Sequence, residues 1–162
     1  MLGILVNIMN IGLDIHGVID TYPEIFSEAS KRWKSQGHTI HIMTGERWDT
    51  AVDTVNKCDI VFDKYLSITD YHLAKTGMNW KETGWWTDNE IWDATKGKYC
   101  EDKFIELVFD DTLRYWKYMP LYTRFMYVKK GMTVETVNAF IREIDLWIPT
   151  IHNPIYYKER YL

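Results

Sequence analysis

The alternation of short apolar runs with amphipathic segments constrains the fold of this chain more than any other feature. Such alternation is typical of a parallel sheet covered by helices on its faces. The sequence therefore predicts an α/β fold, a three-layer α/β/α Rossmann-like sandwich around a central, mostly parallel five-stranded sheet. Strands are expected at residues 11–15, 39–43, 105–109 and 124–128, with a further strand within residues 60–68. Helices are expected at residues 24–35, 48–55, 69–75, 95–103 and 134–147.

Length and hydrophobic content favour one domain over residues 1–162. A chain of 162 residues with 46% hydrophobic residues can bury one core, and a second core is not expected. Residues 1–8 precede the first strand, and we expect them to be a dispensable extension. Helical periodicity fails over residues 77–95, so we expect a Trp-rich irregular insert there. The tryptophans of the segment Trp80–Trp92 suit either a small lid over a ligand site or the aromatic anchoring of a loop.

The net charge and the cysteine content limit the classes of binding partner and the cellular compartment that we expect for this chain. The net charge is −4 and Lys and Arg form no run, so no strong nucleic-acid signal is present. The opening apolar stretch is far shorter than the roughly 20 residues that span a bilayer, and it lacks a basic start, so no membrane partner is expected. Cys58 and Cys100 form no CxxC pattern, which favours free thiols in a reducing cytoplasm.

Polar residues lie at the C-terminal ends of three predicted strands. Asp14 and His16 lie at the end of the first strand, Thr44 at the end of the second, and Asp110 with Asp111 at the end of the fourth. Ligands bind at the carboxyl edge of open α/β sheets, so these side chains are placed where a site is expected. Carboxylates that converge there repel each other without a cation, and Mg²⁺ prefers oxygen ligands of this kind. The sequence thus predicts a Mg²⁺ and phosphate site at this edge.

At these positions the chain resembles the haloacid dehalogenase (HAD)-like hydrolase superfamily, over about residues 9–128. The run IGLDIHGVID is similar to the first motif of that family, an apolar strand followed by Asp-x-Asp-Gly-(Val/Thr)-(Leu/Ile). The run HIMTG resembles its second motif, Lys96 matches the third-motif lysine, and the end of LVFDD matches the acidic fourth motif.

The resemblance implies a role for each matching residue. Asp14 is expected to be the nucleophile that forms an aspartyl-phosphate. Lys96 is expected to neutralise charge, and Thr44 with the amides after it to hold the phosphoryl oxygens. The implied Mg²⁺ ligands are the Asp14 carboxylate, the His16 backbone carbonyl and Asp110, with Asp111 as a direct or water-mediated ligand. The substrate-binding residues that follow are Gly17, Thr44, Gly45, Arg47 and Lys96, and the catalytic ones are Asp14, His16, Thr44 and Lys96.

Two of these assignments have alternatives in the sequence. Lys98 competes for the lysine role, although the spacing to Asp110 favours Lys96. Arg47 is placed either to clamp a second anionic group of the substrate or to form a surface ion pair.

His16 is the main departure from the family pattern, which has Asp at this position to protonate the leaving group and activate water. Histidine can do acid–base work, because its unperturbed pKa is about 6.5. Three outcomes remain open: a working general acid, a poor one with slow turnover, or a metal and phosphate site without useful catalysis.

The spacing between motifs leaves no room for a folded cap, so the resemblance implies a capless or minimally capped member. An open site accepts a large or exposed phosphate, or it borrows a lid from another copy in a homo-oligomer. The leading hypothesis is a cytoplasmic, Mg²⁺-dependent phosphatase that hydrolyses a small phosphorylated metabolite, with a nucleotide as the favoured candidate. The alternatives are a phosphatase acting on a nucleic-acid end or a phosphoprotein, and a regulatory module that keeps only the metal and phosphate site.

Overall fold

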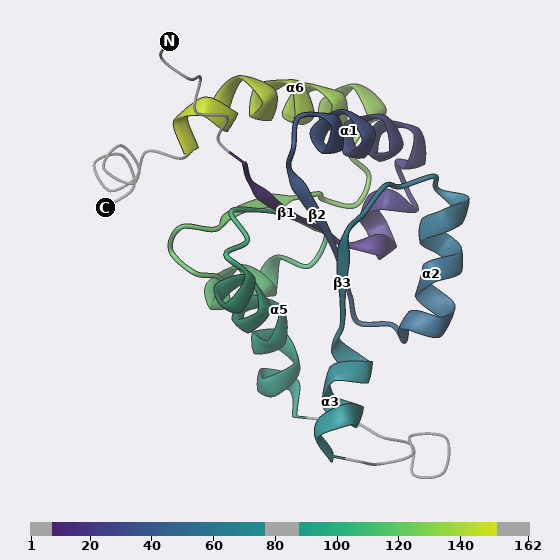
Figure 1. The fold of residues 1–162 in the computed structure, drawn as a ribbon, viewed down its shortest axis with the longest axis vertical. Helices are drawn as coiled ribbons and strands as arrows, with labels where there is room; N and C mark the ends of the chain where they lie inside the picture. Colours follow the sequence, from purple (N-terminus) through teal and green to yellow (C-terminus); the bar gives the residue numbers. More distant parts are fainter. Residues whose placement is uncertain (1–7, 77–87, 152–162) are drawn as a thin grey trace.

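The computed structural model describes residues 8–76 and 88–151, with the backbone alone for residues 76 and 147–151. One sheet forms the centre of the molecule, and all of its neighbouring strands run parallel in the order β3-β2-β1-β4-β5 (Figure 1). The predicted α/β class and the five-stranded sheet are therefore confirmed. The strands are β1 (Asn10–Leu13), β2 (Thr39–Thr44), β3 (Lys64–Ser67), β4 (Leu107–Asp110) and β5 (Arg124–Tyr127).

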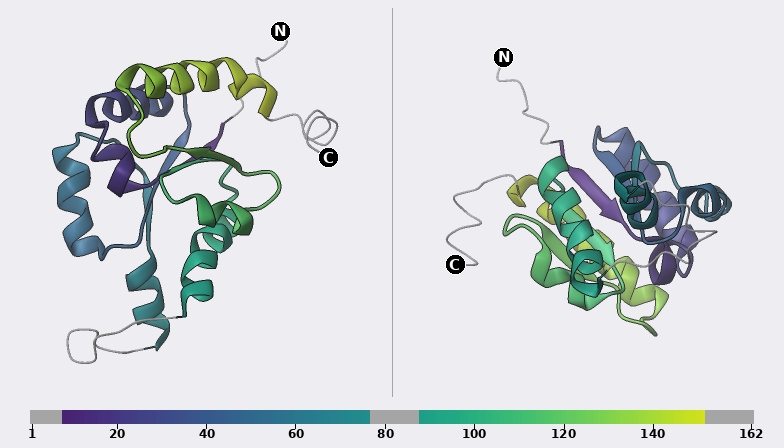
Figure 2. Two further views of the ribbon diagram at one scale, coloured as in Figure 1. Left: turned by 180° about the vertical axis from the view of Figure 1, so that it is seen from behind. Right: turned by 90° about the horizontal axis from the view of Figure 1, so that it is seen from below.

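Helices connect the strands and cover the sheet. Viewed from two opposite sides, α1 and α6 lie next to each other across one end of the molecule (Figures 1 and 2). The helix α5 packs against the short helix η2 and also contacts α3. The helical elements are η1 (Ile15–Ile19), α1 (Pro23–Ser35), α2 (Trp48–Lys57), α3 (Ile68–Thr76), α5 (Asn89–Lys103), η2 (Leu113–Tyr118) and α6 (Val134–Ile151).

Successive residues of each strand face opposite layers, and this gives the molecule two apolar clusters. On β4, Leu107 and Phe109 belong to the larger cluster, whereas Val108 belongs to the smaller one. The larger cluster joins the sheet to α1, α2 and α6, and includes Phe26 and Trp33 packed against the Phe109 ring. The smaller cluster joins the opposite face to α3 and α5. The sheet is thus buried on both faces, as in a three-layer sandwich.

The main correction concerns α5, which begins at Asn89 rather than at residue 95. The side chain of Asp88 accepts hydrogen bonds from the backbone N–H groups of Glu90 and Ile91, which stabilises this earlier start. Trp92 therefore lies on a helix, and the predicted irregular insert is wrong for residues 89–95. The other tryptophans of the predicted insert, Trp80, Trp85 and Trp86, lie outside the described residues.

The first strand is also shorter than expected. It ends at Leu13, and the chain turns into η1, where Gly17 has a φ of 77°. The predicted dispensable extension lies outside the described residues, apart from exposed Ile8. The next residue, Met9, is fully buried and donates its backbone N–H to Nδ1 of His38. Within the described ranges, no helix is long and apolar enough to cross a membrane.

Candidate active site

The site lies where the neighbouring strands β1 and β4 end side by side. Leu13 of β1 is in register with Phe109 of β4, and the backbone N–H of Asp14 donates to the Phe109 carbonyl at 3.0 Å. Asp14 is therefore level with the end of β4, where Asp110 and Asp111 follow. Each of the three aspartates offers a carboxylate oxygen, and these oxygens lie within 4.8 Å of one another. The predicted meeting of acidic residues from near the beginning of the chain and from two-thirds along it is present at the carboxyl edge of the sheet.

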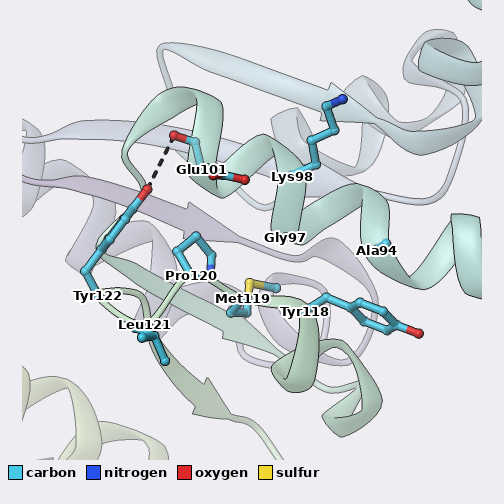
Figure 3. A pocket seen from close by; sticks show the side chains of 9 residues that line it. All are labelled: Ala94, Gly97, Lys98, Glu101, Tyr118, Met119, Pro120, Leu121 and Tyr122. Carbon is cyan, nitrogen blue, oxygen red and sulfur yellow. Dashed lines mark hydrogen bonds between the residues drawn. The ribbon is translucent and has the colours of Figure 1, made fainter. Parts of the chain in front are cut away.

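Lys96 of α5 joins two of these carboxylates. Its Nζ atom lies 3.0 Å from Oδ1 of Asp14 and 2.6 Å from Oδ2 of Asp110, and its side chain is only 2% exposed. The competing candidate, Lys98, is exposed and borders an open hollow of about 570 Å³ between α5 and residues 118–122 (Figure 3). Of the two lysines that the sequence offered, Lys96 is the one in the carboxylate cluster.

The position of Lys96 depends on a close approach between α5 and η2. A Cβ atom added at Gly97 would lie 2.1 Å from the carbonyl oxygen of Tyr118, so only glycine fits this contact. The approach brings the ring of Tyr115 within 5.0 Å of Nζ of Lys96. Nε1 of Trp92 in turn donates to the Tyr115 hydroxyl at 3.1 Å. Sequence reasoning missed Tyr115, because η2 has no apolar periodicity that would have signalled a buried aromatic.

The electrostatics of the cluster leave an excess of negative charge. Burial, the largest cause, raises the pKa of Asp14 to about 7, with Lys96 opposing the shift and Asp110 and Asp111 adding to it. Burial lowers the pKa of Lys96, but Asp110 and Asp14 outweigh that effect and hold it above its ordinary value. One ammonium thus faces three carboxylates when all are ionised. A divalent cation would balance them.

The donor set also fits Mg²⁺ in its chemistry, because carboxylate oxygens are the ligands that this ion takes from proteins. Hydrogen bonds hold two of the acidic side chains in place. Oδ1 of Asp110 accepts from the backbone N–H of Thr112 at 2.9 Å, and Oδ1 of Asp111 accepts from the Thr112 hydroxyl at 3.0 Å. A Cβ atom at Gly17 would lie 2.3 Å from Oδ2 of Asp111, so the turn after β1 closes directly onto this carboxylate.

The side chain of His16 lies between two further acidic groups. Its Nε2 atom is 2.8 Å from Oε2 of Glu46, and its Nδ1 atom is 3.2 Å from Oδ2 of Asp20. Burial lowers the pKa of His16, but the hydrogen bonds to Glu46 and Asp20 outweigh it, and the net pKa is raised. Asp20 also accepts from the backbone N–H of Gly17, and thus stabilises the turn. Sequence reasoning did not find the contact with Glu46, because it joins two loops that are 30 residues apart.

The second predicted strand ends in a loop with several fixed contacts. Thr44 is fully buried, and its Oγ1 atom accepts from the backbone N–H of Glu46 at 3.1 Å. Gly45 packs against the Trp92 ring, since an added Cβ atom would lie 2.7 Å from Cζ2 of that ring. Nε of Arg47 donates to Asp70 at 3.1 Å, which corresponds to the ion-pair alternative. A substrate contact by Arg47 stays a prediction.

The structure therefore brings the predicted site residues to one edge, but by contacts of different kinds. Asp14, Lys96 and Asp110 are joined directly, and Asp111 completes the carboxylate group. Thr44 ends β2, the neighbour of β1 in the sheet. The remaining predicted residues, His16, Gly17, Gly45 and Arg47, occupy the turns that follow β1 and β2.

Fold and site together define a class: a parallel α/β sandwich with a buried lysine–carboxylate cluster at the carboxyl edge of its sheet. In comparisons with known proteins, the sequence matches no protein-family model and no curated protein. Among solved structures it is similar to a glycosyltransferase from Rickettsia africae ESF-5, with a TM-score of 0.43 and 16% sequence identity. That likeness covers 74% of this chain and 29% of the other, so it carries no argument about activity.

Proposed function

We propose that this chain is a Mg²⁺-dependent phosphatase of the haloacid dehalogenase type that hydrolyses a phosphate monoester through an aspartyl-phosphate. One observation carries the proposal: buried Lys96 bridges buried Asp14 and Asp110, which meet Asp111 in a group of three carboxylates at the end of parallel strands. A buried nucleophile, a fixed cation and a cluster of oxygen ligands are the parts that phosphoryl transfer needs.

In the first step, a carboxylate oxygen of Asp14 attacks phosphorus and the bond between phosphorus and the ester oxygen breaks. The leaving oxygen takes a proton from His16, the acid in the proposed scheme. In the second step, water attacks the phosphorus of the aspartyl-phosphate and gives a proton to His16. The bond from phosphorus to the Asp14 oxygen breaks, which releases inorganic phosphate and restores the carboxylate.

The other residues act by position and charge. Lys96 offsets negative charge on Asp14 and on the phosphoryl group, and the Thr44 hydroxyl donates to a phosphoryl oxygen. Mg²⁺, held by Asp14, Asp110 and Asp111 with the His16 carbonyl, would supply charge stabilisation for the phosphoryl oxygens.

The substrate class in this proposal is a small phosphorylated metabolite, with a nucleotide favoured. A nucleic-acid end or a phosphoprotein is the alternative substrate, and a second copy of the chain is the proposed source of any further cover over the site. The cytoplasmic location belongs to the same proposal. It is supported by Cys58 and Cys100, which are both free thiols.

The environment of His16 favours a second candidate, a metal and phosphate module with weak turnover. Both ring nitrogens of His16 are engaged by Glu46 and Asp20, and the side chain is 61% exposed. A general acid must reach the leaving oxygen, so these contacts have to yield during the reaction.

Phosphate release from a panel of aryl and alkyl monoesters, with and without Mg²⁺, tests the proposal. We expect Mg²⁺-dependent release by the wild-type protein and its loss in Asp14→Asn. Asp59→Asn is the matched control, because Asp59 is a surface residue paired with Lys31. Equal release by wild type and Asp14→Asn would overturn the enzymatic proposal. Mg²⁺ and phosphate binding without release would favour the weak module.

A further inference from the structure

Two hydroxyl groups from the β3–α3 junction fix the loop that follows β2. Oγ of Ser67 donates to the carbonyl of Glu46 at 2.7 Å, and Oγ1 of Thr69 donates to the carbonyl of Gly45 at 2.7 Å. Two successive carbonyl groups of the loop are therefore held by side chains of one neighbouring segment. The sequence resemblance assigns no role to either hydroxyl.

The strand order shows on which side of β2 these two contacts lie. In the sheet, β3 lies on one side of β2, and β1 with Asp14 lies on the other. The Gly45 and Glu46 carbonyls bond to the β3 side. Because the C=O and N–H of a trans peptide point in opposite directions, the N–H groups of Glu46 and Arg47 point away from the β3 side. The carboxylate cluster also lies away from β3, because Asp14 follows β1, on the other side of β2.

One of these amides connects the loop to Thr44 by a hydrogen bond. The N–H of Glu46 donates to Oγ1 of Thr44 at 3.1 Å, and Thr44 is fully buried. A hydroxyl that accepts one hydrogen bond can still donate its own proton. The contact with the Glu46 amide thus leaves the hydroxyl proton of Thr44 available to donate to a ligand oxygen.

The junction that provides the two hydroxyls is itself braced. Oγ of Ser67 accepts from the backbone N–H of Asp70 at 3.1 Å, and Ser67 is buried. The Asp70 carboxylate accepts from the backbone N–H of Trp48 at 2.8 Å and from Nε of Arg47 at 3.1 Å. Both ends of the loop are therefore tied to the first residues of α3.

We propose that Ser67 and Thr69 are positioning residues for phosphate binding: their hydroxyls hold the Gly45–Glu46 carbonyls on the β3 side, so that the Glu46 amide stays bonded to Thr44 and the Thr44 hydroxyl proton faces a phosphoryl group near Asp14. The inference rests on the proposed function for the identity of the ligand. It adds two residues that act through the backbone without touching the substrate.

The test measures the dissociation constant for inorganic phosphate in the presence of Mg²⁺ by calorimetry, together with KM and kcat. Thr69→Val removes the hydroxyl at nearly constant shape, and Thr69→Ser keeps it. Thr123→Val is the matched control, because Oγ1 of Thr123 also donates to a carbonyl, that of Ile105, at 2.7 Å, but just before β5 begins. Ser67→Ala is the fourth variant, used after circular dichroism has shown that it folds.

We expect Thr69→Val to weaken phosphate binding about tenfold, as the loss of one ordering hydrogen bond would. KM should rise with it, while Thr69→Ser and Thr123→Val stay near wild type. The ¹⁵N–¹H signal of the Glu46 amide should shift with phosphate in the wild type and less in Thr69→Val. Equal phosphate binding by Thr69→Val and Thr123→Val would overturn the inference, and so would a wild-type protein that binds no phosphate.

The two proposals fail separately. If wild type turns over substrate and Thr69→Val matches Thr123→Val, the positioning role is wrong and the phosphatase stands. If wild type binds phosphate without turnover and Thr69→Val weakens that binding, the positioning role stands and the phosphatase is wrong.

Discussion

The Nζ atom of Lys96 lies 2.6 Å from Oδ2 of Asp110, and neither side chain has more than 2% of its surface exposed. The same ammonium is 3.0 Å from Oδ1 of Asp14, so one buried cation serves two buried anions. Such a group is costly to desolvate, and it is stable only while all of its members are present. The cluster can therefore be tested by measuring the free energy of unfolding of variants as well as their activity.

Removal of the buried ammonium should destabilise the fold strongly. Lys96→Met leaves Asp14 and Asp110 without their cation, and we expect the free energy of unfolding to fall by about 3–5 kcal/mol. Lys98→Met is the matched control, and it should change stability by less than about 0.5 kcal/mol because Lys98 is exposed. Urea unfolding followed by circular dichroism measures both. A similar loss in the two variants would contradict the assignment of Lys96 to the cluster.

Gly17→Ala should weaken Mg²⁺ binding as well as stability. Gly17 has a φ of 77°, and an added Cβ atom would meet Oδ2 of Asp111 at 2.3 Å. Gly131 also has a positive φ, of 88°, but no atom lies within 4 Å of its added Cβ. Both alanine variants should lose about 1 kcal/mol through backbone strain. Only Gly17→Ala should also lose Mg²⁺ affinity in a calorimetric titration. Equal Mg²⁺ affinities of the two alanine variants would contradict the contact with Asp111.

If His16 is the general acid, its removal should matter most for poor leaving groups. His16→Asn should slow hydrolysis of an alkyl phosphate by about 10²–10⁴-fold, because the alkoxide needs a proton as it leaves. An aryl phosphate with an acidic phenol should be affected far less. The ratio of kcat/KM for the two substrates measures this difference. An unchanged ratio would favour the weakly active metal and phosphate module.

Acid should destabilise the protein through His41, which is buried on β2. Burial, the largest cause, and then Lys64 lower the pKa of His41 from 6.5 to about 4, with Asp63 opposing them. Nδ1 of His41 is 2.8 Å from the Tyr99 hydroxyl and Nε2 is 3.2 Å from Oδ1 of Asn10, which suits a neutral ring with its proton on Nε2.

The unfolded chain binds this proton between about pH 6.5 and pH 4, whereas the folded chain does not. The contribution of the neutral ring to the free energy of unfolding is therefore fully present above about pH 6.5. It falls as the pH drops below that value, by at most about 1.4 kcal/mol per pH unit. His41→Gln should flatten this dependence. Denaturant unfolding at several pH values measures it, and parallel slopes in both proteins would contradict the role of His41.

The positions of those site residues that follow from the geometry of a parallel sheet could be predicted from the sequence. Asp14 and Asp110 each follow an apolar run, and parallel neighbouring strands bring such positions to one edge whatever the distance along the chain. Lys96 could be placed by its spacing before the fourth strand. That spacing favoured Lys96 over Lys98, and the packing of α5 separates the two lysines clearly, because a shift of two residues on a helix moves a side chain to a different face.

The start of α5 could not be predicted, for a reason that is connected with the site. Its buried face carries Thr95, Lys96, Gly97 and Cys100 rather than an apolar stripe. Helical periodicity is read from apolar residues, so a helix that buries a charged residue and a glycine at a polar site loses that signal. The contacts of Glu46, Ser67 and Thr69 were also beyond the sequence, because they depend on how loops from separate strands meet.

The central claim is that Asp14, Asp110 and Asp111 hold one divalent cation, and a calorimetric Mg²⁺ titration tests it most directly. Wild type and the control Asp59→Asn should each bind one Mg²⁺ per chain with equal affinity. Asp111→Asn, which leaves both contacts of Lys96 intact, should weaken binding at least tenfold, as a loss of about 1.4 kcal/mol would. Equal Mg²⁺ affinity in Asp111→Asn and Asp59→Asn, or a wild-type protein that binds no Mg²⁺, would contradict the account.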